Sequence, residues 1–341
     1  MSNQFNPELI KVLVTGANGF VGQSLCKQLL QQDDFVRAAI RDLNKTVSAS
    51  EKVLISDLDA NTDWSLALQD IQVVIHLAAR VHVMKETSTD ALAEFRKVNV
   101  EGTVNLARQA VRAGVTRFIY LSSIKVNGEQ TLPGLPYTSE DVPNPIDPYG
   151  ISKQEAEIAL RQLSAESGLD VVIIRPPLIY GSSVKANFYS MIRMLDKNVP
   201  LPFASIANKR SLVALDNLND LIITCIKHST VVNQTFLVSD GHDLSTPELL
   251  KRMAVALGKK VYLLPVPSAL LVVVATILGQ KAIAQRLCGS LQVDMTKTCE
   301  ILAWQPPVNV EDALAKAAQW YKNRHSDSNN VYTRRGHRCG K

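Results

Sequence analysis

Short apolar runs alternate with amphipathic segments along the first half of the chain. Runs rich in β-branched residues predict buried strands, and they cover residues 10–15, 35–40, 52–55, 73–77, 118–121 and 171–175. Apolar residues recur at helical spacing between them, most clearly at 20–32, 95–113 and 152–166. Strands that alternate with helices predict an α/β fold, a doubly wound parallel sheet with helices on both faces.

The alternation loosens after residue 176. Proline-containing turns near residues 176, 200, 265 and 306 separate shorter elements, which predicts a smaller C-terminal lobe. The longest apolar run of this half, Ala269–Leu278, has ten residues, and a bilayer-spanning helix needs about 20. We therefore expect no transmembrane segment. The run predicts a buried or interface helix, with a membrane-surface contact as the alternative.

Composition and charge exclude several classes of protein. Hydrophobic residues make up 46% of the 341 residues, which is enough for a large core. The net charge is +5, and residues 324–341 carry five basic residues and one acidic residue, or +4 of it. The nearly neutral body argues against a nucleic-acid groove. The five cysteines are scattered and the histidines lack metal-ligand spacing, so we expect a cytoplasmic protein with no disulfides and no metal.

A glycine-rich turn follows the first predicted strand and opens the first helix. Gly16, Gly19 and Gly22 have the spacing G-x-x-G-x-x-G. They permit a tight turn, close approach of a pyrophosphate and close packing of the helix on the strand, and the helix N-terminus attracts the phosphates. The chain thus divides into a Rossmann-type dinucleotide-binding domain (8–176), a mixed α/β substrate-binding lobe (177–323) and a basic tail expected to be disordered (324–341).

The residues at the end of the second predicted strand indicate whether the cofactor is NAD or NADP. A carboxylate at this position would bond the ribose 2′-OH of NAD, but Ile40 stands there. Arg41 follows, and its guanidinium can pair with the 2′-phosphate of NADP. NADP is therefore favoured, although Asp42 keeps NAD open. Asp57, after the third strand, is either an acceptor for the adenine amino group or a turn residue.

Tyr149 and Lys153 form a Y-x-x-x-K pair on one face of a predicted helix. An ammonium beside a phenol favours the phenolate and should lower the pKa of Tyr149, which could then exchange a proton with a hydroxyl or ketone. Ser123, just after the fifth strand, would donate to the same substrate oxygen. Together with the glycine turn, these residues predict a nicotinamide-dependent oxidoreduction.

With these motifs, the sequence resembles the extended short-chain dehydrogenase/reductase family, which comprises sugar-nucleotide epimerases and dehydratases. The turn TGANGFVG, the segments HLAA (76–79) and VNVEGT, the Ser122–Ser123 pair and the RPP segment (175–177) occur in the family's order. The resemblance implies that Ser123, Tyr149 and Lys153 are catalytic. The motifs and the resemblance together predict cofactor contacts from Gly16, Asn18, Gly19, Phe20, Val21, Gly22, Arg41, Asp57, Leu58, Leu77, Ala78, Ala79, Asn99, Tyr149, Lys153 and Pro176.

The C-terminal lobe is also similar to that of nucleotide-sugar enzymes. The resemblance places Asn187 near the substrate diphosphate and Arg210 on its phosphates, with Ser123 and Tyr149 on the sugar. A helix cap and a surface charge are the alternatives for Asn187 and Arg210. The acidic pair of 4,6-dehydratases is missing, because Ile124 and Lys125 follow Ser123. Two further departures, Leu178 and Asn127, predict altered sugar contacts.

The resemblance implies hydride transfer at C4 of a nucleotide sugar, UDP-linked by similarity to enzymes of bacterial surface-polysaccharide synthesis. Two reactions fit, a 4-epimerase and a 4-ketoreductase. Arg41 favours the reductase, and the breadth of the family favours the epimerase. A reductase of a non-sugar carbonyl or hydroxysteroid and a non-catalytic NADP sensor are the alternatives. The resemblance also implies a homodimer through the helices near 95–113 and 152–166.

Overall fold

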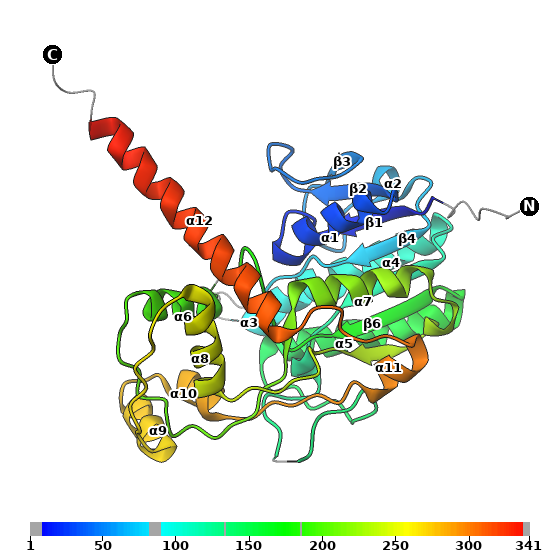
Figure 1. Cartoon of the computed structure of the whole chain (residues 1–341). Helices are drawn as coiled ribbons and strands as arrows, with labels where there is room; N and C mark the ends of the chain where they lie inside the picture. Colours follow the sequence, from blue (N-terminus) through cyan, green and yellow to red (C-terminus); the bar gives the residue numbers. More distant parts are fainter. Residues whose placement is uncertain (1–8, 82–89, 133, 185, 337–341) are drawn as a thin grey trace, which may run out of the picture.

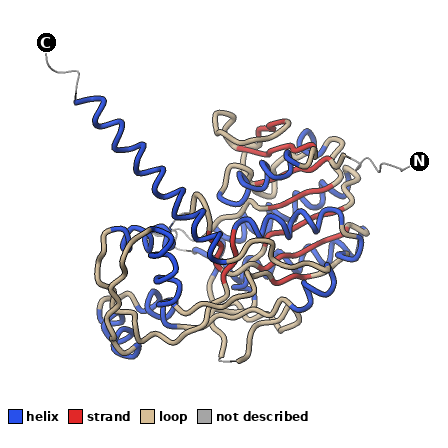
Figure 2. Tube along the Cα trace, viewed as in Figure 1, coloured by secondary structure: helices blue, strands red, loops and turns tan. Residues whose placement is uncertain are grey.

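The computed structural model describes residues 9–81, 90–132, 134–184 and 186–336. Its centre is a seven-stranded parallel sheet of strand order β3-β2-β1-β4-β5-β6-β9 (Figure 2). The register sets Val14 beside Ala38 on one side and beside Ile75 on the other. The strands are β1 (Lys11–Thr15), β2 (Phe35–Ile40), β3 (Glu51–Leu54), β4 (Val73–His76), β5 (Arg117–Leu121), β6 (Asp170–Arg175) and β9 (Thr235–Leu237). The predicted doubly wound parallel sheet is therefore confirmed.

Helices cover both faces of the sheet, and each face has its own core. Alternate residues of each strand point to opposite faces. Ile119 thus packs in the core that holds α1 (Phe20–Gln31) and α7 (Leu215–Lys227). Its neighbour Phe118 packs in the core under α4 (Thr103–Arg112) and α5 (Pro148–Ser167). The shorter elements of this domain are α2 (Ser65–Leu68), α3 (Ala91–Arg96), the π-helix η1 (Lys97–Gly102), the 3-10 helices η2 (Ile124–Val126) and η3 (Ser229–Val231), and α11 (Thr296–Leu302).

The smaller lobe lies beyond one end of the sheet (Figure 1). A third core, which includes Tyr180, Phe188, Met253 and Leu314, joins most of its helices to a two-stranded parallel sheet. The lobe contains β7 (Leu178–Tyr180), β8 (Leu212–Ala214), α6 (Ala186–Asp196), α8 (Thr246–Leu257), α9 (Ser268–Ile277), α10 (Lys281–Cys288) and α12 (Val310–Gly336).

The structure differs from the sequence-based division at both predicted boundaries. The chain returns to the sheet after residue 176, because α7 packs against β5 and α1, and β9 pairs with β6. In the tail, α12 continues to Gly336 and projects away from the body, where we expected disorder (Figure 1). Extending an existing helix adds one hydrogen bond for each residue fixed, so a segment of low apolar content can continue it. Among the described residues, no helix combines the length and the apolar character needed to cross a bilayer.

Candidate functional site

The glycine turn after β1 has the geometry that a dinucleotide requires. Gly16 has a φ of +66°, and a Cβ there would lie 2.8 Å from the backbone nitrogen of Ala78. A Cβ on Gly22 would lie 2.3 Å from the carbonyl oxygen of Gly16, so only glycine lets α1 pack this closely on the turn. Gly19 caps α1 without a side-chain hydrogen bond. The first-turn N–H groups of α1 are therefore not taken by a capping side chain, and they fit a pyrophosphate.

The carboxyl end of β4 lies beside this turn and is held by a buried histidine. Thr15 Oγ1 lies 2.7 Å from His76 Nδ1 and accepts a 3.2 Å hydrogen bond from the Ala78 N–H. The other ring nitrogen of His76 lies 2.9 Å from Thr103 Oγ1, on α4. Burial is the main reason that the pKa of His76 falls to about 3. A neutral His76 thus connects β1, β4 and α4 and fixes the course of the Leu77–Ala79 segment.

Arg41 and Asp57 face each other where the adenosine half of the cofactor should lie. Arg41 Nη1 lies 3.3 Å from Asp57 Oδ1, and the two side chains are 70% and 53% exposed. Asp57 Oδ1 also accepts a 2.8 Å hydrogen bond from the Leu58 N–H. Leu58 in turn packs against Gly102, where a Cβ would approach it to 2.9 Å. Arg41 thus already has a carboxylate partner, and the contacts of Arg41, Asp57 and Leu58 with a cofactor stay predictions.

Asn99 lies in the π-helix η1 and joins two further segments of the site. Its side-chain amide donates to the Arg80 carbonyl and to Ser152 Oγ, both at 3.0 Å. Its Oδ1 accepts a 2.8 Å hydrogen bond from the Arg80 N–H. Asn99 is 1% exposed. It therefore fixes α5, which carries Tyr149 and Lys153, to the loop that leaves β4, and its predicted contact with the cofactor stays a prediction.

Tyr149 and Ser123 meet in the structure. Tyr149 is in the first turn of α5, where the Asp147 side chain caps the helix by accepting a 2.7 Å hydrogen bond from the Gly150 N–H. The Tyr149 ring also contacts Phe95, with 6.1 Å between centroids. Burial and, next, the Asp147 carboxylate raise the pKa of Tyr149, and its hydrogen bond with Ser123 acts in the opposite direction. The expectation that Lys153 dominates and lowers this pKa is corrected, because burial is the largest effect.

Lys153 lies one helical turn further along α5 and is nearly inaccessible, at 2% exposed. Its ammonium donates a 2.8 Å hydrogen bond to the Leu121 carbonyl and lies 4.4 Å from the centre of the Tyr120 ring. Burial lowers its pKa to about 7, and Glu157 partly opposes that shift. Lys153 thus ties α5 to the end of β5, from which Ser123 follows. The three predicted catalytic residues lie together at the carboxyl ends of the strands.

A buried polar network behind these residues was missed by the sequence analysis. Glu157 accepts hydrogen bonds from Arg175 at 2.9 and 2.5 Å and from Ser122 Oγ at 2.5 Å. Arg175 also donates to Asn127 Oδ1 at 2.9 Å, and the Asn127 amide donates to the Thr138 carbonyl at 2.8 Å. Asn127 is therefore a buried partner of Arg175, and the interpretation that it alters sugar contacts is corrected. The available signal was Glu157, four residues after Lys153 on the same helix face.

The remaining predicted residues fall around this centre or in the lobe. Pro176 is buried, and its carbonyl accepts a 3.0 Å hydrogen bond from the Ile124 N–H, so β6 and the Ser123 turn are joined. Arg210 donates to the carbonyls of Arg286 at 2.8 Å and Gly289 at 3.0 Å, and its pKa is lowered by burial and then by Arg286. Asn187 is in α6, but its side chain lies outside the described residues. The roles of Asn187 and Arg210 on a diphosphate stay predictions.

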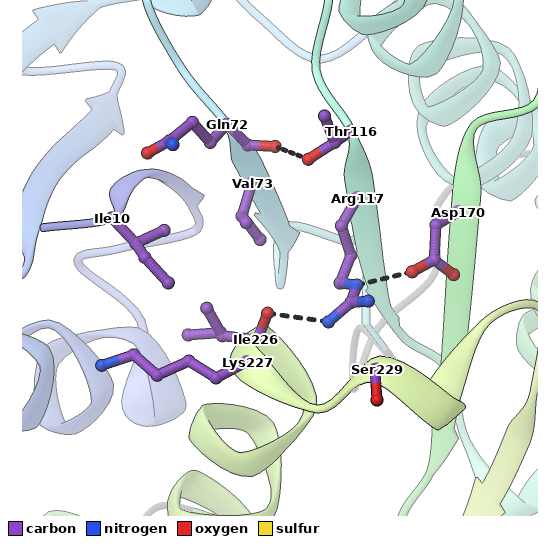
Figure 3. Close-up of a pocket in the computed structure, with 9 residues that line it drawn as sticks. All are labelled: Ile10, Gln72, Val73, Thr116, Arg117, Asp170, Ile226, Lys227 and Ser229. Atoms are coloured by element: carbon purple, nitrogen blue, oxygen red, sulfur yellow. Dashed lines mark hydrogen bonds and ion pairs between the residues drawn. The ribbon is translucent and has the colours of Figure 1, made fainter. Parts of the chain in front are cut away.

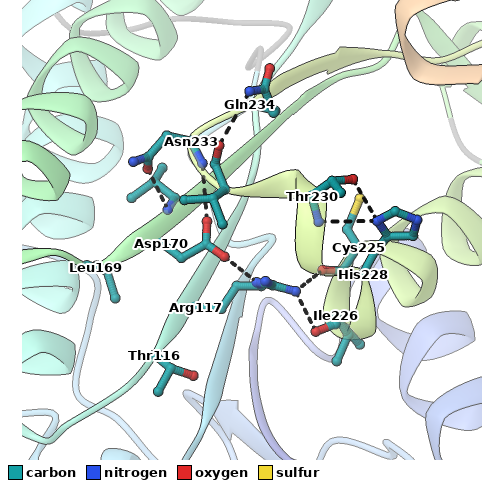
Figure 4. Close-up of polar contacts among 12 residues, drawn as sticks. Thr116, Arg117, Leu169, Asp170, Cys225, Ile226, His228, Thr230, Asn233 and Gln234 are labelled. Atoms are coloured by element: carbon teal, nitrogen blue, oxygen red, sulfur yellow. Dashed lines mark hydrogen bonds and ion pairs between the residues drawn. The ribbon is translucent and has the colours of Figure 1, made fainter. Parts of the chain in front are cut away.

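A separate cavity lies at the other end of the strands, away from the candidate site. It has a volume of about 600 Å³, and Arg117, Asp170 and Lys227 are among its lining residues (Figure 3). Arg117 donates to Asp170 at 2.6 Å and to the carbonyls of Cys225 and Ile226 at 2.8 and 2.7 Å (Figure 4). The cavity lies at the amino ends of β4, β5 and β6, so the polar groups there hold α7 to the sheet and take no part in the site at the carboxyl ends.

Comparisons with known proteins agree with this geometry. The model of the "NAD dependent epimerase/dehydratase family" matches residues 12–238. A UDP-glucose 4-epimerase from Vibrio cholerae is 48% identical over 90% of this chain and 94% of its own length. A UDP-glucose 4-epimerase from Mycolicibacterium smegmatis is 30% identical over 92% and 99%. The crystal structure of UDP-glucuronic acid 4-epimerase from Bacillus cereus with NAD has a TM-score of 0.73 at 20% identity, covering 92% of this chain and 99% of that one.

Proposed function

Because the chain belongs to the NAD dependent epimerase/dehydratase family, we propose that it is an NAD-dependent 4-epimerase of a UDP-linked hexose. The observation that carries this proposal is that Ser123, Tyr149 and Lys153 gather at the end of β5, in a chain that has a glycine turn after β1 and is 48% identical to a UDP-glucose 4-epimerase. The family, the fold and the type of enzyme agree; the sugar, the choice between NAD and NADP and the choice between epimerase and ketoreductase are the finer parts of the proposal.

The residues present divide the chemistry between them. Bound NAD supplies the hydride acceptor and donor. We assign to Tyr149 the proton transfer at O4: ionised as the phenolate, it would accept the O4 proton of the sugar and return it after the sugar has presented its other face, with Ser123 as its hydrogen-bond partner. Ser123 orients O4 by the same contact. The Lys153 ammonium, when protonated, would stabilise the Tyr149 phenolate by its positive charge, and burial lowers the pKa of Lys153 to about 7.

The same geometry argues against a 4,6-dehydratase. That reaction removes water from the sugar and needs an acid and a base next to Ser123. Ile124 is buried there, and Lys125 pairs with Asp147 and, at 3.3 Å, with Glu129. A 4-ketoreductase would need only the residues already described. We favour the epimerase because the two relatives described above are both 4-epimerases, and this chain aligns with nearly the whole length of each.

We propose NAD as the cofactor. NADP is the alternative, and Arg41 is the residue that predicts it. Ile40 ends β2 as a buried residue, so no carboxylate stands at the usual position for the ribose 2′-OH. A 2′-phosphate would have to replace Asp57 as the partner of Arg41 and would lie near that carboxylate. This competition is the physical reason to treat the NADP preference as a separate question.

We also propose a homodimer through α4 and α5. These two helices pack against each other and bury one face on the sheet. Their outward face includes Ile158, which is 55% exposed. A four-helix contact between two copies would cover it and would support the α5 helix that carries Tyr149.

The test is to incubate the purified chain with UDP-glucose, UDP-galactose, UDP-N-acetylglucosamine or UDP-N-acetylgalactosamine and to follow C4 configuration by NMR. We expect one pair to equilibrate without net consumption of added reduced cofactor. Tyr149→Phe should lower the rate by about 100-fold or more, while retaining cofactor binding. Stoichiometric loss of NADPH with a 4-keto sugar would establish the reductase instead. Turnover of a hydroxysteroid and of no nucleotide sugar would reject the proposal.

A further inference from the structure

An exposed apolar hairpin stands at the end of the substrate-binding lobe. It consists of α9, α10 and the segment 262–267 that leads into α9, and we call it the lobe hairpin. None of the residues of α9 is buried, although its sequence SALLVVVATI is almost entirely apolar. Ile277 is 79% exposed and Val273 is 54% exposed. The large apolar side chains exposed on the lobe hairpin are Tyr262, Leu264, Leu270, Val273, Val274, Ile277 and Ile283.

The rest of the described chain does not cover this surface. α9 packs against α10, and Figure 1 shows both helices at the end of the lobe remote from the sheet. The leading segment is held by backbone hydrogen bonds between Leu201 and Leu264, of 2.8 Å, and from Ala204 to Leu264, of 3.1 Å. Isolated apolar side chains on a surface are ordinary, but a contiguous apolar helix marks a contact with another apolar phase or protein.

The charge around the lobe hairpin selects among the possible occupants. From Gly258 to Gln292 the sequence has four basic residues, Lys259, Lys260, Lys281 and Arg286, and no acidic residue. Lys259 pairs with Asp196 at 3.1 Å. Lys260 and Arg286 are exposed, and neither forms a salt bridge with a described carboxylate. An apolar face bordered by unneutralised basic side chains is the arrangement that binds an anionic lipid surface.

We propose that the lobe hairpin lies in the interfacial layer of a bilayer that contains anionic lipid, and that the protein binds membranes peripherally through it. The side chains of α9 would enter the boundary between headgroups and acyl chains, and Lys260 and Arg286 would remain among the phosphates. Tyr262, which is 53% exposed, has the amphipathic ring that favours this layer. The ten residues of α9 are too few to span the membrane, so the contact is with one leaflet.

A second copy of the chain fits this surface less well. A two-fold dimer brings the same patch of each copy together, so the basic residues of one lobe hairpin would face those of the other. Without an acidic residue between Gly258 and Gln292, the patch offers no partner for that charge. Anionic lipid supplies both the apolar phase and the opposite charge. The lipid surface is therefore the occupant that satisfies both observations.

The test is flotation of the full chain with vesicles of phosphatidylethanolamine and phosphatidylglycerol, compared with vesicles of phosphatidylcholine alone. We expect binding to the anionic vesicles that weakens as salt is raised. The double variant Val273→Asp/Ile277→Asp should bind anionic vesicles at least about ten-fold more weakly than the unaltered chain, because charged side chains at these positions oppose insertion. The variant Lys260→Gln/Arg286→Gln should lose most of the salt dependence while the apolar contact persists.

Matched controls separate loss of docking from loss of folding. Leu66 is 74% exposed and belongs to α2, which Figure 1 shows in the sheet domain away from the lobe hairpin, so Leu66→Asp should bind vesicles like the unaltered chain. All variants should keep the same melting temperature and the same turnover of a nucleotide sugar in solution. The proposal is overturned if the unaltered chain does not float with anionic vesicles, or floats equally with both lipids at every salt concentration. It is also overturned if Val273→Asp/Ile277→Asp changes only the oligomeric state.

Discussion

Removing the charge of Glu157 should destabilise the protein far more than removing the charge of Glu155, two residues earlier on α5. Glu157 is 0% exposed and pairs with Arg175, which is 1% exposed. Glu155 pairs with Arg96 at 2.6 Å, but their side chains are 31% and 47% exposed. Breaking a buried pair leaves an uncompensated charge and costs about 3–5 kcal/mol, whereas an exposed pair contributes about 0–1 kcal/mol. Glu→Gln is nearly isosteric, so both changes alter charge with little change in packing.

The assay is thermal and urea unfolding of Glu157→Gln and Glu155→Gln under identical conditions. At about 2 °C per kcal/mol for a chain of this size, Glu157→Gln should lower the melting temperature by roughly 6–10 °C and Glu155→Gln by less than about 2 °C. If Glu157→Gln does not yield folded protein, the double variant Glu157→Leu/Arg175→Met removes both charges and should regain much of the loss. Glu157 also contacts the Arg161 guanidinium at 3.3 Å, but that side chain is 44% exposed and can be hydrated when Glu157 is replaced. Equal, small effects of the two single variants would refute the argument that Arg175 depends on Glu157 for compensation of its buried charge.

Two further predictions concern pH and the cofactor. Because the pKa of His76 falls to about 3 in the folded chain, the unfolded chain binds more protons between about pH 3 and 6.5, so stability should decrease as the pH falls through this window, at up to about 1.4 kcal/mol per pH unit. Urea unfolding from pH 7.5 to 4.5 should show a shallower decline for His76→Gln, and equal slopes would contradict a buried neutral His76. Arg41→Ala should weaken NADPH binding by about 10- to 100-fold and NADH binding little, in fluorescence titrations with Lys45→Ala as the control; equal losses for both cofactors would show that Arg41 does not contact a 2′-phosphate.

The sheet could be predicted from sequence because its strands are short, apolar and β-branched, and their bounds moved by only a residue. Five of the six strands before residue 176 follow this pattern, and β3, with the sequence EKVL, is mostly exposed at the edge of the sheet. The seventh, β9, has only three residues, too few for a clear strand pattern, so its pairing with β6 after the crossover helix α7 defines it. Similarly, the return of α7 to the sheet depends on tertiary packing with α1, which local periodicity does not report.

The candidate site divides in the same way. Ser123, Tyr149 and Lys153 belong to motifs with fixed spacing, so their proximity could be anticipated. The Glu157–Arg175–Asn127 network joins residues up to 48 positions apart, and although Arg175 belongs to a motif, nothing in the sequence shows that the three side chains meet. The pKa of Tyr149 was misjudged for a related reason: spacing shows which charges are neighbours, whereas burial, the larger effect, depends on the complete fold.

The π-helix η1 has a consequence for how the family can tolerate length changes. In an α-helix each residue advances the chain by about 100°, so deleting one residue would turn every later side chain away from its neighbours. A π-turn is one residue wider than an α-turn, and deletion within Lys97–Gly102 would restore an ordinary α-helix and leave α4 in phase with the sheet. The deletion would remove the hydrogen bonds of Asn99 with Arg80 and Ser152 and would disturb the packing of η1 on α3 and α5. A single-residue deletion within Lys97–Gly102 would therefore leave the fold in place while it removes contacts that support the site.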